Sequence, residues 1–297
     1  MKLSGPDLHL LAVFDSVVRN KGFSAAQAEL GLSQPTISNH ITALETRLGM
    51  TLCQRGRRGF QLTEKGQRVH EIATDLMQWL DSHSNELTAL KGSLVGHLRV
   101  AVVDCVATDP SMRLPQTINS LLDTAPGIKV DLSIERPQSI LSGLNDGRFH
   151  IGIGSFDNKV GGLSYERLYE ESHSLYCGQS HPLVRQTDRE VTQDEMDACV
   201  WVHRGYWNRQ RQRTQKVIEA DRIVDDIEAQ ILFVLSGRYI GLLPDHAAEP
   251  HVAAGRLRQL PLHEDNFICT MELVCKLGRQ PKIVQLFCKA LTDQCRK

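Results

Sequence analysis

The chain has 297 residues, 41% of them hydrophobic and 23% charged, which is enough for two or three compact units with apolar cores. The 34 Lys and Arg residues against 35 Asp and Glu residues give a net charge of -1, so the protein is not basic overall and any nucleic-acid surface must be local. The longest apolar runs, such as residues 231–235, are far shorter than the roughly 18 residues that a membrane span needs.

The start of the chain turns polar at once and lacks the apolar core of a secretion signal, so we expect a cytoplasmic protein with no membrane partner. Eight cysteines are scattered without the close pairs of zinc or redox motifs. We therefore expect no metal site, no cofactor and no disulfide framework.

Positive charge is concentrated near the N-terminus. Residues 1–70 hold nine basic and five acidic side chains, a surplus of four. The densest stretch is opposed only by Glu64 and contains Arg55, Arg57, Arg58, Lys65 and Arg68. Such a cluster is often only a solvated surface, and the segment before it decides between that and a phosphate contact.

The first fifty residues predict a helix-turn-helix. Apolar residues recur at helical spacing over residues 8–18, and Ser24 with Gln27 has the spacing of a capping box for a short second helix. Gly31 can end that helix in the left-handed conformation, and Ser33 can cap a third. The pattern is a helix, a three-residue turn and a helix.

The third predicted helix has a buried stripe and an uncharged outer face. Ile37, Ile41, Leu44 and Leu48 form the stripe, while the other side carries small hydroxyl and amide residues that suit base edges and phosphates. Residues 51–62 predict a hairpin with a basic turn, the wing. The predicted DNA contacts are Ser24, Ala25, Ser33, Gln34, Pro35, Thr36, Ser38, Asn39, Thr42, Arg55, Arg57 and Arg58.

Five short motifs in this region carry a family resemblance. FSAA at 23–26, LGLSQPTISNHI at 30–41, ALE at 43–45, RLG at 47–49 and LTEKG at 62–66 resemble the N-terminal signature of the LysR-type transcriptional regulators. The resemblance implies an N-terminal winged helix-turn-helix that is mainly α-helical, a long dimerising linker helix, and a C-terminal α/β region. It also implies that this last region consists of two Rossmann-like subdomains resembling the type 2 periplasmic-binding-protein fold.

On this basis residues 1–62 are the DNA-binding domain, 63–91 the linker helix and 92–297 the effector-binding domain. Its first subdomain is expected at 97–162 and 267–297, and its second at 163–266. The implied partners are double-stranded DNA at a pseudo-palindromic promoter site, a small-molecule effector, RNA polymerase, and further copies of the chain in a homodimer and a homotetramer.

The linker helix is also visible as a pattern. Thr63 can cap it, and its apolar positions follow steps of three, four and seven residues, which predicts a dimer seam with His83 as a polar interruption. The seam positions are Val69, Ile72, Leu76, Leu80, Leu87 and Leu90.

After residue 96 strands and helices alternate, which predicts parallel sheets covered by helices in two units with a cleft between them. The expected strands are 98–103, 129–134, 150–153, 163–169, 174–177, 199–203, 222–224, 239–242 and 268–276. The expected helices are 112–122, 139–144, 207–220, 226–235 and 282–295.

Ligands of such sheets bind beyond the carboxyl ends of strands. This rule selects the effector candidates Asp104, Cys105, Val106, Gly154, Ser155, His203, Arg204, Tyr206, Leu243 and Pro244. Asp104 and Asp109 would make the opening of the expected cleft acidic, which disfavours a bare carboxylate ligand and suits a cationic, amphoteric or neutral aromatic one. Arg204, in contrast, could hold a carboxylate. The sequence therefore leaves the chemical class of the effector open.

The sequence leaves two alternative functions, an α/β enzyme and a thiol-redox sensor. An α/β enzyme lacks support because we find no nucleophile elbow, phosphate loop or zinc-protease motif, so no catalytic residue is assigned. Regulation by thiol oxidation would use Cys105 or Cys199, of which the second opens an apolar strand. His181, His246, His251 and His263 are interpreted as surface-loop residues.

Overall fold

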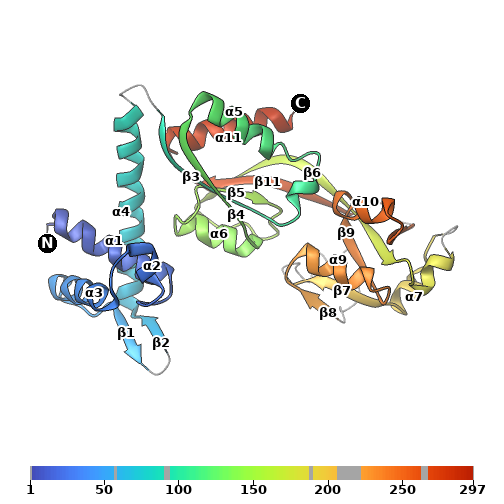
Figure 1. Ribbon diagram of the computed structural model, residues 1–297, viewed down its shortest axis with the longest axis horizontal. Helices are drawn as coiled ribbons and strands as arrows, with labels where there is room; N and C mark the ends of the chain where they lie inside the picture. Colours follow the sequence, from blue (N-terminus) through green and yellow to red (C-terminus); the bar gives the residue numbers. More distant parts are fainter. Residues whose placement is uncertain are drawn as a thin grey trace. The chain divides into compact units, whose positions relative to one another are not determined.

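The computed structural model describes residues 2–56, 59–89, 94–186, 190–205, 222–261 and 267–296. The chain divides into two compact units, residues 1–87 and 88–297 (Figure 1). No helix among the described residues has the length and apolar character needed to cross a membrane.

Unit 1 is a helical domain with one hairpin. Its elements are α1 (Gly5–Arg19), α2 (Ala26–Leu30), α3 (Gln34–Leu48), β1 (Cys53–Gly56), β2 (Gly59–Leu62) and α4 (Glu64–Ala89). The two strands pair antiparallel, with Cys53 opposite Leu62. Helices α1, α2 and α3 together with the hairpin match the predicted winged helix-turn-helix.

Local signals set the ends of these helices. Gly31 and Gly49 follow α2 and α3 with φ of 64° and 66°, the left-handed region that glycine tolerates best. The Ser33 hydroxyl accepts the Thr36 N–H at 3.4 Å, as a cap should. The capping box expected at Ser24 is wrong: α2 begins after Ala25, and Gln27 instead donates its side-chain amide to the Ser24 carbonyl at 3.3 Å.

The core of unit 1 joins all of these elements. Phe14, Ile37 and Leu52 are fully buried in it, and α4 contributes Ala73. Thr63 accepts the Gly66 N–H at 2.9 Å and so caps α4 as predicted. A Cβ on Gly66 would lie 1.9 Å from the Leu52 carbonyl oxygen, so glycine allows α4 to pack closely against the start of the hairpin.

The described residues of unit 2 form a mixed sheet of nine strands. Eight of them lie in the order β4-β3-β5-β11-β6-β9-β7-β8, and the ninth, β10, pairs with β6. The strands are β3 (Val95–Val102), β4 (Gly127–Ile134), β5 (Ile151–Gly154), β6 (Leu163–Gly178), β7 (Val200–Arg204), β8 (Arg222–Val224), β9 (Tyr239–Pro244), β10 (Leu257–Leu260) and β11 (Phe267–Lys276).

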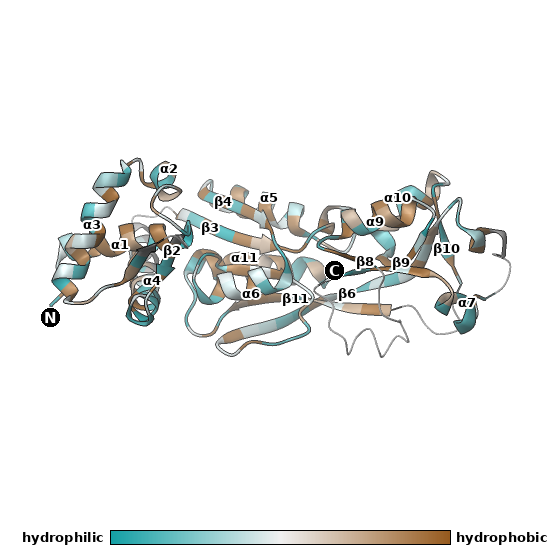
Figure 2. Ribbon diagram, turned by 90° about the horizontal axis from the view of Figure 1, so that it is seen from below, coloured by the Kyte–Doolittle hydropathy of each residue, from teal (hydrophilic) through white to brown (hydrophobic). Residues whose placement is uncertain are grey.

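The helices of unit 2 are α5 (Leu114–Thr124), α6 (Pro137–Asn145), α7 (Gln193–Asp197), α9 (Ile227–Leu235), α10 (Asp245–Ala253) and α11 (Lys282–Cys295), with 3-10 turns η1 (Val106–Thr108) and η2 (Pro182–Gln186). Helices α5 and α11 lie together on one side of the first sheet half, and α6 lies on the other (Figure 1). Figure 2 shows hydrophobic and hydrophilic residues alternating along these strands and helices.

Two strands cross from one half of unit 2 to the other. β6 pairs with β11 along its first part and with β9 and β10 along its last part, and β11 also pairs with β5. The first subdomain has one core that includes residues of α11, and the second has two smaller cores. The chain therefore returns to the first subdomain at its C-terminal end, as the family resemblance implied.

Three sequence expectations need correction. Residues 163–169 and 174–177 belong to one strand, because pairing continues past the polar residues between them. The sheet is mixed rather than parallel, since β6, β10 and β11 run antiparallel to their neighbours. His246 and His251 lie on the unpredicted helix α10, and His181 is buried. The helix expected at 207–220 and His263 lie outside the described residues.

Candidate nucleic-acid interface and ligand cleft

The outer face of α3 is open to solvent within unit 1. Gln34, Pro35, Asn39 and Thr42 are exposed, while Ile37, Ile41 and Leu44 on the opposite side are buried. Figure 2 draws much of α3 in hydrophilic and neutral colours. Thr36 and Ser38 are partly exposed on the same face, and Ser24, Ala25 and Ser33 are exposed near it.

Hydrogen bonds fix several of these polar groups. The hydroxyls of Ser33 and Thr36 lie 2.8 Å apart, and the Thr42 hydroxyl donates to the Ser38 carbonyl at 3.0 Å. Thr46 donates to the Thr42 carbonyl at 2.8 Å in the same way. Because the Thr42 and Thr46 hydroxyls donate their hydrogens to carbonyl groups of α3, their oxygen lone pairs can still accept hydrogen bonds from a ligand.

The hairpin is fixed to α3 through one carboxylate. The Glu45 side chain accepts the Leu52 N–H at 2.7 Å and the Cys53 N–H at 3.3 Å, which anchors the chain where β1 begins. Arg55 lies on β1, and Arg57 with Arg58 lies outside the described residues. The predicted wing therefore follows directly from an anchored strand.

The apolar residues of α4 fall into two groups, one packed against the core of unit 1 and one exposed to solvent. Val69 and Leu76 are partly buried against the core of unit 1, which leaves them less surface for the predicted dimer seam. Ile72 and Leu87 are 49% and 66% exposed. Trp79, which the sequence reading missed, is 57% exposed on the same stripe and stacks on His83 at 4.2 Å. Leu90 lies outside the described residues.

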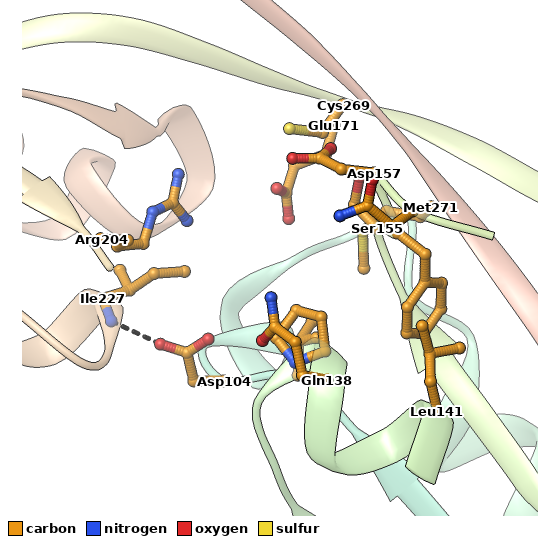
Figure 3. Close-up of a pocket in the computed structure, with 14 residues that line it drawn as sticks. Asp104, Gln138, Leu141, Ser155, Asp157, Glu171, Arg204, Ile227, Cys269 and Met271 are labelled. Carbon is orange, nitrogen blue, oxygen red and sulfur yellow. Dashed lines mark hydrogen bonds between the residues drawn. The ribbon is translucent and has the colours of Figure 1, made fainter. Parts of the chain in front are cut away.

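Unit 2 has a cleft where its two subdomains meet (Figure 3). Segments from β3, α6, the loop after β5, β6, β7, α9 and β11 contribute to its walls. The lining residues are Val103, Asp104, Pro137, Gln138, Leu141, Ser155, Phe156, Asp157, Asn158, Glu171, Arg204, Ile227, Cys269 and Met271.

Asp104 and Arg204 lie on opposite subdomains at this cleft. Asp104 follows β3 and accepts the N–H of Ile227 at the start of α9 (Figure 3). Burial raises the pKa of Asp104, against the opposing effects of that N–H and of Arg204. Arg204 ends β7 and is 3% exposed. A desolvated carboxylate and a desolvated guanidinium thus border the same space.

Glu171 holds a small network at the edge of the cleft. Its carboxylate lies 3.1 Å from His246 Nε2 and 3.4 Å from His173 Nε2, and His246 Nδ1 lies 2.8 Å from the Thr108 hydroxyl. Cys269 is directly opposite Glu171 in the β6–β11 pairing. Two groups of potential metal ligands share Glu171, one with His173 and Cys269 and one with Asp109 and His246. The contacts with His246 and His173 orient the Glu171 carboxylate.

The effector candidates chosen from strand ends separate into two sets. Asp104, Ser155 and Arg204 line the cleft. Six others do not: Cys105, Val106, Gly154, His203, Leu243 and Pro244. Tyr206 lies outside the described residues.

Core packing explains why the second set points elsewhere. Val106 and Leu243 are buried in hydrophobic cores, and His203 stacks on Trp201 with 1% exposure. A Cβ on Gly154 would lie 2.5 Å from Val103 Cγ1, so that position permits close packing. Alternate residues at a strand end face opposite sides, and the strand-end rule does not tell the two sides apart.

Sequence reasoning also missed lining residues on the two long antiparallel strands. Glu171 lies in the middle of β6, and Cys269 and Met271 lie in the first half of β11, away from its carboxyl end. Gln138 lies in the first turn of α6 and is exposed. No sequence signal distinguished Glu171 from its charged neighbours Glu166, Arg167 and Glu170.

The thiols do not have the environment of reactive cysteines. The Cys105 thiol donates to Glu228 at 3.2 Å, and burial together with that carboxylate raises the Cys105 pKa. Burial also raises the pKa of Cys199. Cys275 and Cys288 have sulfur atoms 3.6 Å apart, and this contact, with burial, raises the pKa of Cys288. Thiols with raised pKa react slowly as nucleophiles.

Comparison with known proteins identifies the family to which the chain belongs. Residues 8–67 match the bacterial regulatory helix-turn-helix model of the lysR family, and residues 91–296 match the LysR substrate binding domain. The chain belongs to the LysR family of transcriptional regulators. It is a regulator with a helix-turn-helix domain and a two-subdomain effector-binding domain.

Individual relatives and solved structures are similar to this chain over nearly its whole length. The "HTH-type transcriptional activator BauR" of Pseudomonas aeruginosa is 34% identical over 284 residues, which is 95% of this chain and 93% of that protein. Full-length OxyR from Pseudomonas aeruginosa has a similar fold, with a TM-score of 0.71 at 18% identity over 100% of this chain and 95% of that one. Full-length CbnR complexed with its target DNA has a TM-score of 0.63 at 20% identity over 97% and 99% of the two chains.

Proposed function

We propose that unit 1 reads a pseudo-palindromic DNA site with the outer face of α3 while the basic wing contacts phosphate, and that a small molecule in the cleft of unit 2 controls the outcome. The observation that carries the first part is the exposed, uncharged face formed by Gln34, Asn39 and Thr42 above a buried apolar stripe. Amide and hydroxyl groups on a helix suit the hydrogen-bonding edges in the major groove.

The same proposal assigns the other roles. Two copies of the chain associate along the exposed stripe of α4, formed by Ile72, Trp79 and Leu87, and two such dimers form a tetramer. The protein acts in the cytoplasm, has no catalytic residue, and can meet RNA polymerase at the promoter. An effector that prefers one arrangement of the two subdomains shifts the population toward it and thereby alters the spacing or bend of paired DNA sites.

The wing is tested by the salt dependence of DNA binding. We expect the double variant Arg57→Ala, Arg58→Ala to weaken binding to every duplex and to reduce the slope of log affinity against log salt by about two, because each phosphate contact contributes roughly 0.9. The measurement is fluorescence anisotropy of full-length protein with labelled duplexes over a range of salt. The control Arg258→Ala, Arg279→Ala removes the same charge from unit 2. Equal slopes for the wing variant and the wild type would contradict the wing assignment.

Base reading is tested separately on α3. We expect Asn39→Ala or Ser38→Ala to lower the ratio of specific to non-specific affinity by about fivefold or more while the salt slope stays the same, since a base contact is worth roughly 1–3 kcal/mol. Competition between a selected site and random duplex measures that ratio. Glu29→Ala on α2 is not expected to change it.

A further inference from the structure

Three potential metal ligands meet at the edge of the cleft in unit 2. One ligand atom from each of Asp109, Glu171 and His246 lies within 4.8 Å of the other two. Asp109 follows the turn η1, Glu171 lies on β6 and His246 lies in the first turn of α10. Their side chains are only 5%, 10% and 9% exposed. Cysteine spacing, on which the expectation of no metal site rested, carries no information about ligands from three distant segments.

The distances between these ligand atoms fit a small cation. His246 Nε2 lies 3.1 Å from Glu171 Oε1 and 3.8 Å from Asp109 Oδ2. Two ligands at about 2.1 Å from a tetrahedral zinc ion lie roughly 3.4 Å apart. Small shifts of the three side chains therefore suffice for all of them to coordinate one ion.

The other ring nitrogen of His246 has a partner of its own. Nδ1 lies 2.8 Å from the Thr108 hydroxyl, which donates its hydrogen to the Cys105 carbonyl at 3.0 Å and so can accept the Nδ1–H. This tautomer directs the lone pair of Nε2 at two carboxylates, which is favourable only with a proton or a metal ion between them. Histidines that bind metals are oriented in the same way, by a hydrogen bond from the ring nitrogen that does not bind the ion.

Within the described part of the chain, only histidines offset the charge of the two carboxylates. Asp109 and Glu171 both pair with His246. Glu171 also pairs with His173, and neither carboxylate pairs with a lysine or an arginine. The buried Oδ2 of Asp109 makes no well-formed hydrogen bond with the described residues. The nearby Tyr169 hydroxyl is neutral and adds no positive charge, because burial and then the Asp109 charge raise its pKa.

We propose that Asp109, Glu171 and His246 bind a divalent transition-metal ion, Zn²⁺, and that this ion joins the two subdomains. Carboxylate oxygens together with an imidazole nitrogen suit Zn²⁺, whereas Mg²⁺ and Ca²⁺ prefer ligand sets made of oxygen alone. The turn η1 contributes Val106 to the core of the first subdomain, and α10 contributes Ala247 to a core of the second. An ion held by residues of both segments therefore connects the two cores.

A second group of potential ligands shares Glu171 but offers a different set of atoms. It combines Glu171 with His173 and Cys269 on the paired strands β6 and β11. His173 and Cys269 are buried, and the His173 ring packs against the Phe267 ring at 5.5 Å. A thiol must lose its proton to bind a metal, which burial disfavours. We therefore assign the ion to the group with two carboxylates.

Metal binding by the full-length protein is the first test. The protein is treated with a chelator, dialysed and titrated with Zn²⁺ in a calorimeter, with Mn²⁺ and Mg²⁺ as comparisons. We expect saturable binding of Zn²⁺ that is at least about tenfold tighter than that of Mn²⁺, and weaker binding still of Mg²⁺. A lack of saturable Zn²⁺ binding, or equal affinities for Zn²⁺ and Mg²⁺, would overturn the proposal.

Variants of the full-length protein locate the ion. We expect Asp109→Asn, Glu171→Gln and His246→Gln each to weaken Zn²⁺ binding by at least about tenfold, because each removes a ligand. The matched control is an exposed imidazole on β3, 3.4 Å from a carboxylate on β4, that belongs to no group of three ligands among the described residues. His97→Gln and Asp131→Asn, which remove this pair, should leave the affinity unchanged. Unchanged affinity in the three ligand variants would overturn the assignment.

Cys269→Ser separates the two groups of ligands. We expect this variant to bind Zn²⁺ as tightly as the wild type does. Weakened binding in Cys269→Ser together with unchanged binding in Asp109→Asn would place the ion in the other group and overturn the proposal.

Hydrogen exchange of the wild type tests the connection between the subdomains without any variant. We expect saturating Zn²⁺ to slow amide exchange in residues 106–112 and 245–253, because the ion restrains both η1 and α10. Exchange that stays the same in both segments would contradict the proposed link.

Discussion

Asp7 is an acidic residue in the first turn of α1 that is tied to α3 through Arg47. The Arg47 guanidinium donates to the Asp7 carboxylate at 2.9 Å, and the Ser4 N–H and hydroxyl donate to it at 2.8 and 2.6 Å. The hydrogen bond from Arg47, followed by that from Ser4, lowers the pKa of Asp7 to about 2. This single carboxylate therefore links the start of the first helix to the end of the helix that carries the proposed DNA-reading face.

The lowered pKa predicts how unit 1 responds to acid. A carboxyl with a depressed pKa in the folded state stabilises that state above its unfolded pKa of about 4, and this contribution is lost as the pH falls toward about 2. We expect Asp7→Asn to lower the melting temperature at neutral pH and the difference from wild type to vanish between pH about 4 and about 2. Circular dichroism melts across this range measure it.

The control for this prediction is Asp123→Asn, an exposed carboxylate on α5. It should show a smaller difference at neutral pH. A difference between Asp7→Asn and wild type that is constant from neutral pH down to about 2 would contradict the role given to Asp7.

Helix α4 has two apolar faces, one packed against the core of unit 1 and one exposed. Ala73, Val69 and Leu76 cover the core of unit 1, while Ile72 and Leu87 face solvent. The sequence pattern combined both faces into one seam, because apolar residues at helical spacing look the same whether they meet the chain's own core or another copy. Burial in unit 1 separates the two.

The exposed face predicts the effect of charge on assembly. We expect Ile72→Glu and Leu87→Glu each to weaken the dimer by at least about tenfold, because burying a carboxylate in an apolar interface is costly. Analytical ultracentrifugation of the full-length protein measures this change. Glu71→Lys changes the charge on a neighbouring face of α4 and should leave the association unchanged. An intact dimer in both seam variants would place the interface elsewhere.

At the scale of the whole molecule, the two units have separate hydrophobic cores, and the C-terminal segment completes the larger one. Strand β11 contributes Met271 and Val274 to the core of the first subdomain, and α11 contributes Phe287 and Leu291, which are fully buried. The second subdomain is inserted between the two parts of the first. Residues at the end of the chain are therefore required for a core that begins near residue 98.

This arrangement predicts how fragments behave. We expect residues 88–297 alone to unfold cooperatively, since that unit has its own cores. Residues 88–266 should not fold, because removing β11 and α11 exposes the core and deletes the central strand pairing with β5 and β6. Thermal unfolding and proteolysis compare the two. Cooperative unfolding of residues 88–266 would contradict the conclusion that β11 and α11 are required for the core of the first subdomain.

The helix-turn-helix, the linker helix and most of the α/β elements could be predicted from the amino-acid sequence. These features rest on local signals such as Ser33 as a cap, Gly31 and Gly49 as helix ends, and the 3.6-residue period of Ile37, Ile41 and Leu44. Local signals lie within one or two turns of the chain, so they can be read without knowing what packs against them.

The residues of the cleft and of the exposed stripe on α4 could not be predicted, because they depend on how distant parts of the chain pack together. Glu171 and Cys269 are far apart in the sequence and become neighbours through the register of β6 and β11. Arg204 and Asp104 were found by the strand-end rule, but Val106 and Leu243, chosen by the same rule, belong to the cores. The direction of a side chain at a strand end depends on which residues pack on each face of the sheet, and that is a property of the folded molecule.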